Sequence, residues 1–175
     1  TFRSFCGPAL LEPIPAGLLI HEAVGHRLEG NRLLSSEEGQ TFRDSTGQMI
    51  LPPFLSMRDD PRMASLNGKS LVGHYRFDDE GVPAQSANLV DRGRLRQFLT
   101  SRTGIRRGHR SNGHARSRYH QRPISRMGVL VVEAEGGLEP SALKQVLLEE
   151  IRRKKAPFGV RIIKASSGET ATDAY

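Results

Sequence analysis

The chain has 175 residues and a mass of 19.4 kDa, enough for one domain with a buried core. A single cysteine, Cys6, excludes an internal disulfide framework and is typical of a reducing compartment, and we expect it to be an ordinary small buried residue. No apolar run approaches the ~20 residues that cross a membrane, and no signal peptide is visible. The start at Thr1 rather than Met is typical of a piece of a longer polypeptide.

The charge is unevenly distributed along the chain. The formal net charge is +7, and residues 92–132 contain eleven arginines with neither lysine nor an acidic residue. Such a block can bind phosphate groups or an acidic partner surface, and guanidinium groups favour bidentate recognition of carboxylate or phosphate. A solvated face is the simpler interpretation.

In chain order, the first predicted elements are an extended segment over residues 1–14 and a helix that runs to about Gly30. Residues 31–69 carry few signals beyond a short strand at 49–51. A strand is predicted at 70–77, and a β-hairpin over residues 87–99, whose turn contains a glycine.

The second half of the chain begins with an irregular stretch over residues 102–126 and a short, buried-type strand at 129–133. The clearest helix covers residues 140–155, and a last strand covers 160–164. Strands outnumber helices and do not alternate with them, so the predicted class is α+β. We expect mixed or antiparallel sheets, a distorted metal-motif helix and one later amphipathic helix. The apolar face of that later helix contains Leu143, Val146, Leu147 and Ile151.

One short apolar stretch contains His21, Glu22 and His26. Neutral imidazole is a preferred zinc ligand, and an adjacent Glu can activate a metal-bound water. The two histidines lie five positions apart, so a regular helix would point them roughly 140° away from each other. A π-bulge, or a helix that loosens before His26, would bring them together, and Gly25 permits either. The stretch predicts a hydrolytic zinc site on a distorted helix; the alternative is a packed His beside a surface Glu.

Other polar residues have two interpretations each. Glu29 lies three positions after His26, where it can be a ligand or accept a hydrogen bond from an imidazole, although a surface Glu is the simpler interpretation. The acidic turn at residues 78–80 can bind a cation or hold an arginine of the basic block, although a solvated turn is the simpler interpretation. Four further histidines are not assigned to the zinc: His74, His109, His114 and His120.

Three more segments, residues 75–83, 89–95 and 112–127, follow the histidine stretch in a fixed order and spacing. Together with residues 16–30 they resemble the TldD/PmbA family of bacterial and archaeal metallopeptidases. The resemblance implies that His21 and His26 are zinc ligands and that Glu22 is the general base. It also implies a peptidase that acts on short or unfolded peptides in the cytoplasm.

The same resemblance implies a homodimer, or a heterodimer with a related family subunit. It places the third zinc ligand, a cysteine, after Tyr175 and a further domain before Thr1. We therefore expect residues 1–175 to be a single domain or a fragment of the metallopeptidase domain, without the N-terminal domain and the C-terminal ligand segment. The residues considered for peptide binding are Arg116, Arg118, Tyr119 and Arg126.

A different class of function is also open at this point. In this alternative the arginine-rich block binds nucleic acid or an acidic partner, and the histidine stretch is structural, with no catalysis. The block contains only two aromatic residues, Phe98 and Tyr119, which argues against a platform for base stacking. Nucleic acid is therefore the less favoured partner.

Overall fold

The computed structural model describes residues 5–36, 40–105 and 108–168. Their contacts divide them into two compact units. The first unit contains residues 5–20 and 136–168, and the second contains residues 21–36, 40–105 and 108–135. The described residues form two α-helices, three short 3-10 helices and small, mostly antiparallel sheets, which confirms the predicted α+β class. The assignment of residues 1–175 to one domain stays a prediction.

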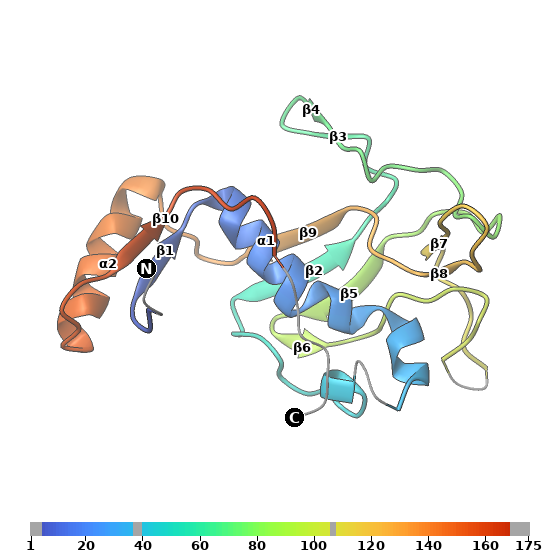
Figure 1. The fold of residues 1–175 in the computed structure, drawn as a ribbon, viewed down its shortest axis with the longest axis horizontal. Coiled ribbons are helices and arrows are strands. Elements are labelled where there is room, and N and C mark those ends of the chain that lie inside the picture. Colours follow the sequence, from blue (N-terminus) through green and yellow to red (C-terminus); the bar gives the residue numbers. More distant parts are fainter. Residues whose placement is uncertain (1–4, 37–39, 106–107, 169–175) are drawn as a thin grey trace. The chain divides into compact units, whose positions relative to one another are not determined.

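In the first unit, a parallel pair of short strands packs with one amphipathic helix. Strand β1 (Ala9–Leu11) pairs with β10 (Val160–Ile162), and helix α2 covers Pro140–Arg153 (Figure 1). A Cβ added at Gly159 would lie 2.7 Å from Cδ1 of Ile151, so the absence of a side chain there lets α2 approach the start of β10. The predictions of the later helix and of the last strand are confirmed, with ends that differ by up to two residues.

The second unit is built on a four-stranded antiparallel sheet in the order β6-β5-β2-β9. The hairpin predicted over residues 87–99 is confirmed, although its second strand is short. Arg92 and Gly93 have φ angles of +45° and +77°, as expected for the tight two-residue turn that matches strand twist. The strands are β2 (Leu55–Asp59), β5 (Ala87–Asp91), β6 (Arg94–Leu95) and β9 (Leu130–Ala134).

The prediction of a strand at residues 70–77 is wrong. Asn67 and Gly68 have φ angles of +50° and +74° and form a tight turn between β3 (Ser65–Leu66) and β4 (Lys69–Ser70), so only the first residue of the predicted stretch is in a strand. After this small hairpin, visible in Figure 1, the chain is irregular. The strand at 49–51 is reduced to one bridge, between Met49 and Arg94.

The motif helix is distorted, as predicted. Helix α1 covers Pro13–Ala23, and Val24 (φ −123°, ψ −51°) interrupts it before the 3-10 helix η1 (Gly25–Leu28). The α-helix therefore loosens before His26 instead of continuing to Gly30. A Cβ at Gly25 would lie 2.4 Å from Sδ of Met127, so this glycine allows Met127 to pack against the interruption.

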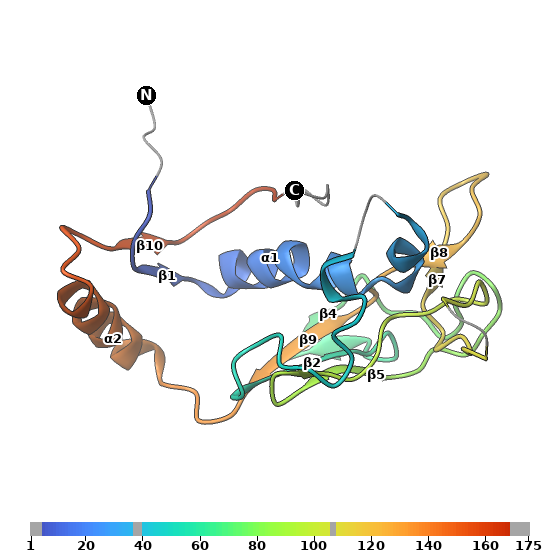
Figure 2. The ribbon, with the colours of Figure 1, turned by 90° about the horizontal axis from the view of Figure 1, so that it is seen from below.

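The chain then continues as two more 3-10 helices, η2 (Gly30–Leu34) and η3 (Gln40–Phe42). Helix η2 contacts β8 (Ile124–Ser125), which pairs with β7 (Ala115–Arg116), and Figure 2 shows these elements beside one another. The fully buried apolar side chains of this unit come from the helical segment, from the sheet and from the loop that follows β6. They include Leu28, Met57, Leu89, Val90, Leu95 and Leu99.

A buried carboxylate joins the end of β2 to the start of β9. Asp59 accepts hydrogen bonds from the backbone N–H groups of Gly128 and Val129, each at 3.0 Å, and its Oδ1 lies 3.2 Å from Nε2 of the buried His114. These contacts satisfy a charged group that would otherwise be costly to bury. Within the described residues, no helix is both long and apolar enough to span a membrane.

The packing of two glycines predicts opposite effects of adding a methyl group. A Cβ at Gly73 would lie 2.0 Å from the backbone oxygen of Gly128, so Gly73→Ala must displace backbone, and we expect a loss of about 1–3 kcal/mol in the free energy of unfolding. Gly17 lies in α1 with no described atom within 4 Å of such a Cβ. Gly17→Ala should therefore stabilise by about 0.5–1 kcal/mol. Urea denaturation of both variants measures the difference, and equal stabilities would contradict the close approach of Gly128 to Gly73.

Candidate metal centre

The three motif residues come together where α1 ends. One donor atom each from His21, Glu22 and His26 lies within 4.8 Å of the others, and no other group of three such side chains is found in the described parts of the chain. Nε2 of His26 lies 3.8 Å from Oε2 of Glu22, and the two imidazole centroids are 4.6 Å apart at a steep angle. The interruption at Val24 thus removes the angular separation that a regular helix would impose.

Glu29 is fully buried and connects this cluster to two arginines. Its Oε1 lies 3.0 Å from Nδ1 of His26, and its Oε2 accepts hydrogen bonds from Nε of Arg32 at 2.9 Å and Nη1 of Arg126 at 3.0 Å. Burial by itself would raise the pKa of Glu29, but the hydrogen bond from His26, the charge of Arg126 and the hydrogen bond from Arg32 outweigh it and hold that pKa below its usual value.

This arrangement fixes the imidazole of His26. An ionised carboxylate only accepts hydrogen bonds, so Nδ1 of His26 carries the proton that Glu29 accepts. When the ring is neutral, Nε2 is then left with its lone pair, on the side where Glu22 lies. A carboxylate behind an imidazole is the usual support of a histidine that binds a metal. Glu29 is therefore not a surface residue, which was the simpler expectation for it.

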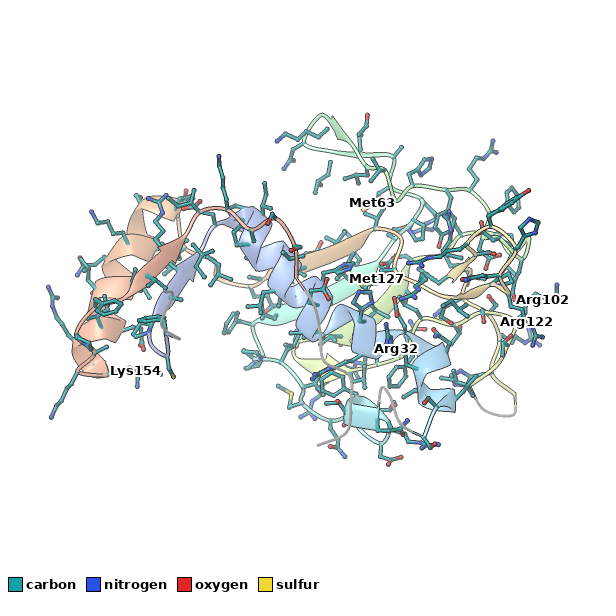
Figure 3. The ribbon with its side chains drawn as sticks, viewed as in Figure 1. Arg32, Met63, Arg102, Arg122, Met127 and Lys154 are labelled. Carbon is teal, nitrogen blue, oxygen red and sulfur yellow. The ribbon has the colours of Figure 1, made fainter. Side chains whose placement is uncertain are left out.

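A cavity of about 350 Å³ opens beside the cluster. Its volume lies at the low end of the range for small-ligand sites, about 300–1,000 Å³. Figure 3 shows Met127 close to the end of α1, whereas Arg102 and Arg122 lie at another edge of the second unit. The lining residues are His21, His26, Glu29, Val72, Gly73, Arg116, Arg126, Met127 and Gly128.

Arg116 is held in place by an aromatic ring and a carboxylate. Its guanidinium carbon lies 4.6 Å from the centroid of the Tyr75 ring, and its Nε lies 3.4 Å from Oδ2 of Asp79. Tyr75 is fixed in turn by a hydrogen bond that it donates to the backbone oxygen of Gly113 at 3.0 Å. Burial and the charge of Asp59 raise the pKa of Tyr75, so the phenol keeps the proton that it donates.

The aspartate side chains of the turn at residues 78–80 bind backbone N–H groups of the arginine-rich segment. Asp78 accepts a hydrogen bond from the N–H of Ala115 at 3.1 Å, and Asp79 accepts one from Ser117 at 2.6 Å. Together with the ion pair between Asp79 and Arg116, these hydrogen bonds attach β7 to the turn. The structure thus favours the second interpretation of this turn, in which it holds the basic block.

Other residues considered from the sequence lie away from the cluster. Tyr119 is 90% exposed, its ring lies 3.8 Å from that of His120 at a tilt of 54°, and neither Tyr119 nor Arg118 is among the residues that line the cavity. His74 contacts the backbone oxygen of Pro61 at 2.9 Å, which is a structural role. The expectation of a buried Cys6 is wrong, because its thiol is exposed.

The arginine-rich block is partly neutralised within the chain. Among its described residues, four side chains form ion pairs with carboxylates at 2.7–3.4 Å, and one of these carboxylates, Glu29, is fully buried. A block whose charges are paired in this way offers fewer free cations to a phosphate backbone than its sequence suggests. The pairs are Arg92–Glu135, Arg96–Asp91, Arg116–Asp79 and Arg126–Glu29.

Comparison with known proteins identifies relatives over part of the chain. A metalloprotease of Synechocystis sp. is 38% identical over 125 residues, which cover 69% of this chain and 25% of the relative. A zinc metalloprotease TldD homologue of Saccharolobus solfataricus is 32% identical over 95 residues, which cover 54% of this chain and 20% of that protein. The chain spans about a quarter of the length of the first two curated relatives that it matches.

The fold agrees with a solved structure. The crystal structure of TldE from Thermococcus kodakarensis superimposes with a TM-score of 0.60 at 21% sequence identity, over 78% of this chain and 30% of that one. The family model described as the PmbA/TldA metallopeptidase C-terminal domain matches residues 6–153. The chain therefore belongs to the PmbA/TldD family of metallopeptidases.

Proposed function

We propose that the protein is a zinc-dependent peptidase in which His21 and His26 hold the zinc and Glu22 is the general base. The observation that carries the proposal is the meeting of these three side chains at the interruption of α1, with His26 oriented by the buried Glu29. A relative named as a zinc metalloprotease supports the choice of metal.

The donor set fits zinc. Neutral imidazole nitrogen is a preferred ligand of this ion, and Nε2 of His26 is the nitrogen left available for it. When bound, zinc lowers the pKa of a water molecule and polarises the carbonyl group that is attacked. A catalytic zinc has three protein ligands, so we infer that the third comes from outside the described residues, consistent with the cysteine that the family resemblance implies.

In the proposed reaction, Glu22 moves the proton. Its carboxylate takes a proton from the attacking water as the water oxygen bonds to the carbonyl carbon of the scissile amide. The carbon–nitrogen bond then breaks, and Glu22 gives the proton to the departing amine, so that an acid and an amine are released. Glu29 keeps His26 in one tautomer throughout, because its own charge is stabilised by Arg32 and Arg126.

The size of the cavity favours short or unfolded peptides as substrates. A space of about 350 Å³ admits a short length of extended chain, which a folded protein does not present. As part of the same proposal, the protein acts in the cytoplasm as a homodimer or with a related family subunit.

Removing the general base should separate catalysis from metal binding. In the complete gene product, Glu22→Gln should lower kcat by at least about a hundredfold, because the amide cannot accept the proton, while zinc content stays unchanged. His26→Ala should lose zinc as well as activity. Hydrolysis of a fluorogenic peptide and elemental analysis measure the two effects. Retained hydrolysis with normal zinc in Glu22→Gln would contradict the assigned role.

Removing the charge behind His26 should weaken metal binding. Glu29→Gln is expected to raise the zinc dissociation constant about 10–100-fold, because the hydrogen bond from the imidazole then goes to a neutral amide and no longer to a charged carboxylate. The measurement is a zinc competition titration with a chelator. Glu150→Gln, which changes an exposed carboxylate paired with Arg153, is the matched control and should leave the zinc affinity unchanged. An unchanged affinity in Glu29→Gln would exclude the supporting role.

A further inference from the structure

We propose that Arg116 binds the C-terminal carboxylate of the peptide, so that the substrates are short peptides with a free C-terminus that are cut close to that end. This inference rests on the proposed function and specifies its substrate class. It is carried by the position of Arg116 in the cavity that His21 and His26 also line.

The two arginines of the cavity are not equivalent. Arg126 contacts both oxygens of Glu29 through Nη1, at 3.3 and 3.0 Å, and its charge balances a fully buried carboxylate. Arg116 is paired with Asp79, whose Oδ2 lies 3.4 Å from its Nε, and neither of its Nη atoms has a hydrogen-bond partner among the described residues. Arg116 therefore has donors available to a ligand, whereas Arg126 is engaged in the support of His26.

Arg116 is also oriented before any ligand binds. The face of its guanidinium lies over Tyr75, and Asp79, which fixes Nε, is itself held by the N–H of Ser117. A side chain as long as arginine usually loses much rotamer freedom when it binds a ligand, and this arrangement reduces that cost. The two Nη groups form the planar pair of donors that matches the two oxygens of a carboxylate.

The apolar residues that line the cavity indicate which side chain the last residue of the peptide carries. Val72 is fully exposed and lines the cavity together with Met127. An apolar side chain on the last residue of the peptide would cover both and remove apolar surface from water. Because Arg116 and the two histidines share a cavity of about 350 Å³, a bound carboxylate holds the scissile amide within a short distance of the chain end.

The first test measures binding without turnover. In the complete gene product carrying Glu22→Gln, fluorescence anisotropy would compare an N-terminally labelled pentapeptide that ends in leucine with the same peptide as a C-terminal amide. The amide removes the charge and keeps the shape. We expect the free acid to bind roughly tenfold to a hundredfold more tightly. Equal dissociation constants for the two peptides would overturn the inference.

The second test assigns the preference to one side chain. Adding Arg116→Gln should reduce the ratio of the two dissociation constants to about one, and Arg116→Lys, which keeps the charge and loses the paired donors, should give an intermediate ratio. Arg110→Gln removes an exposed arginine of the same block that does not line the cavity, and the ratio should persist. A ratio that survives Arg116→Gln overturns the assignment. If that variant does not fold, the Arg116→Lys ratio decides, and an unchanged ratio has the same meaning.

Hydrolysis distinguishes this inference from the function on which it rests. With Glu22 intact, kcat/KM for the acid should exceed that for the amide by a similar factor. If hydrolysis does not depend on zinc and on Glu22, the proposed function fails, and the binding ratio in the Glu22→Gln protein still decides whether Arg116 is a carboxylate site. If hydrolysis depends on both and the two peptides are cut equally, the function stands and the inference fails.

Discussion

The negative charge of Glu29, excluded from water, is the constraint on which the centre of this structure depends. A buried carboxylate is stable only when its surroundings supply charge and hydrogen bonds, and here they come from His26, Arg32 and Arg126. These partners belong to separate parts of the second unit: the interrupted motif helix, the 3-10 helix after it, and the segment that enters β9. One interaction therefore fixes the tautomer of His26 and also closes the cavity wall around it.

The elements that the sequence predicted correctly are those specified by local signals. The apolar spacing in residues 140–153 identifies α2, and Arg92-Gly93 between apolar runs identifies the hairpin. The central strand β2 carries no such signal, because it contains Arg58 and ends on Asp59, a buried carboxylate whose partners lie about 70 residues away. A pattern that depends on distant hydrogen bonds cannot be read from alternating hydrophobicity.

In the candidate site, too, the features set by local sequence were predictable and those set by distant contacts were not. The meeting of His21 and His26 was predictable, because five-residue spacing demands an interruption and Gly25 permits it. The burial of Glu29 was not, because it requires Arg126, 97 residues away, to complete its neutralisation. Arg116 reaches the cavity only because β7 is held by the acidic turn at residues 78–80, a contact that spans 37 residues. Long-range ion pairs of this kind leave no periodic trace in a sequence.

The exposure of Val72 has a consequence for how such a protein can diverge. Its side chain is at the edge of the cavity and outside the core, so exchanging it alters the chemistry offered to a visiting molecule with little effect on folding. Gly73, its neighbour, lacks this freedom because the backbone of Gly128 lies directly against it. The two adjacent positions thus have opposite structural constraints: a substitution at Val72 changes the edge of the cavity, and a substitution at Gly73 displaces the backbone.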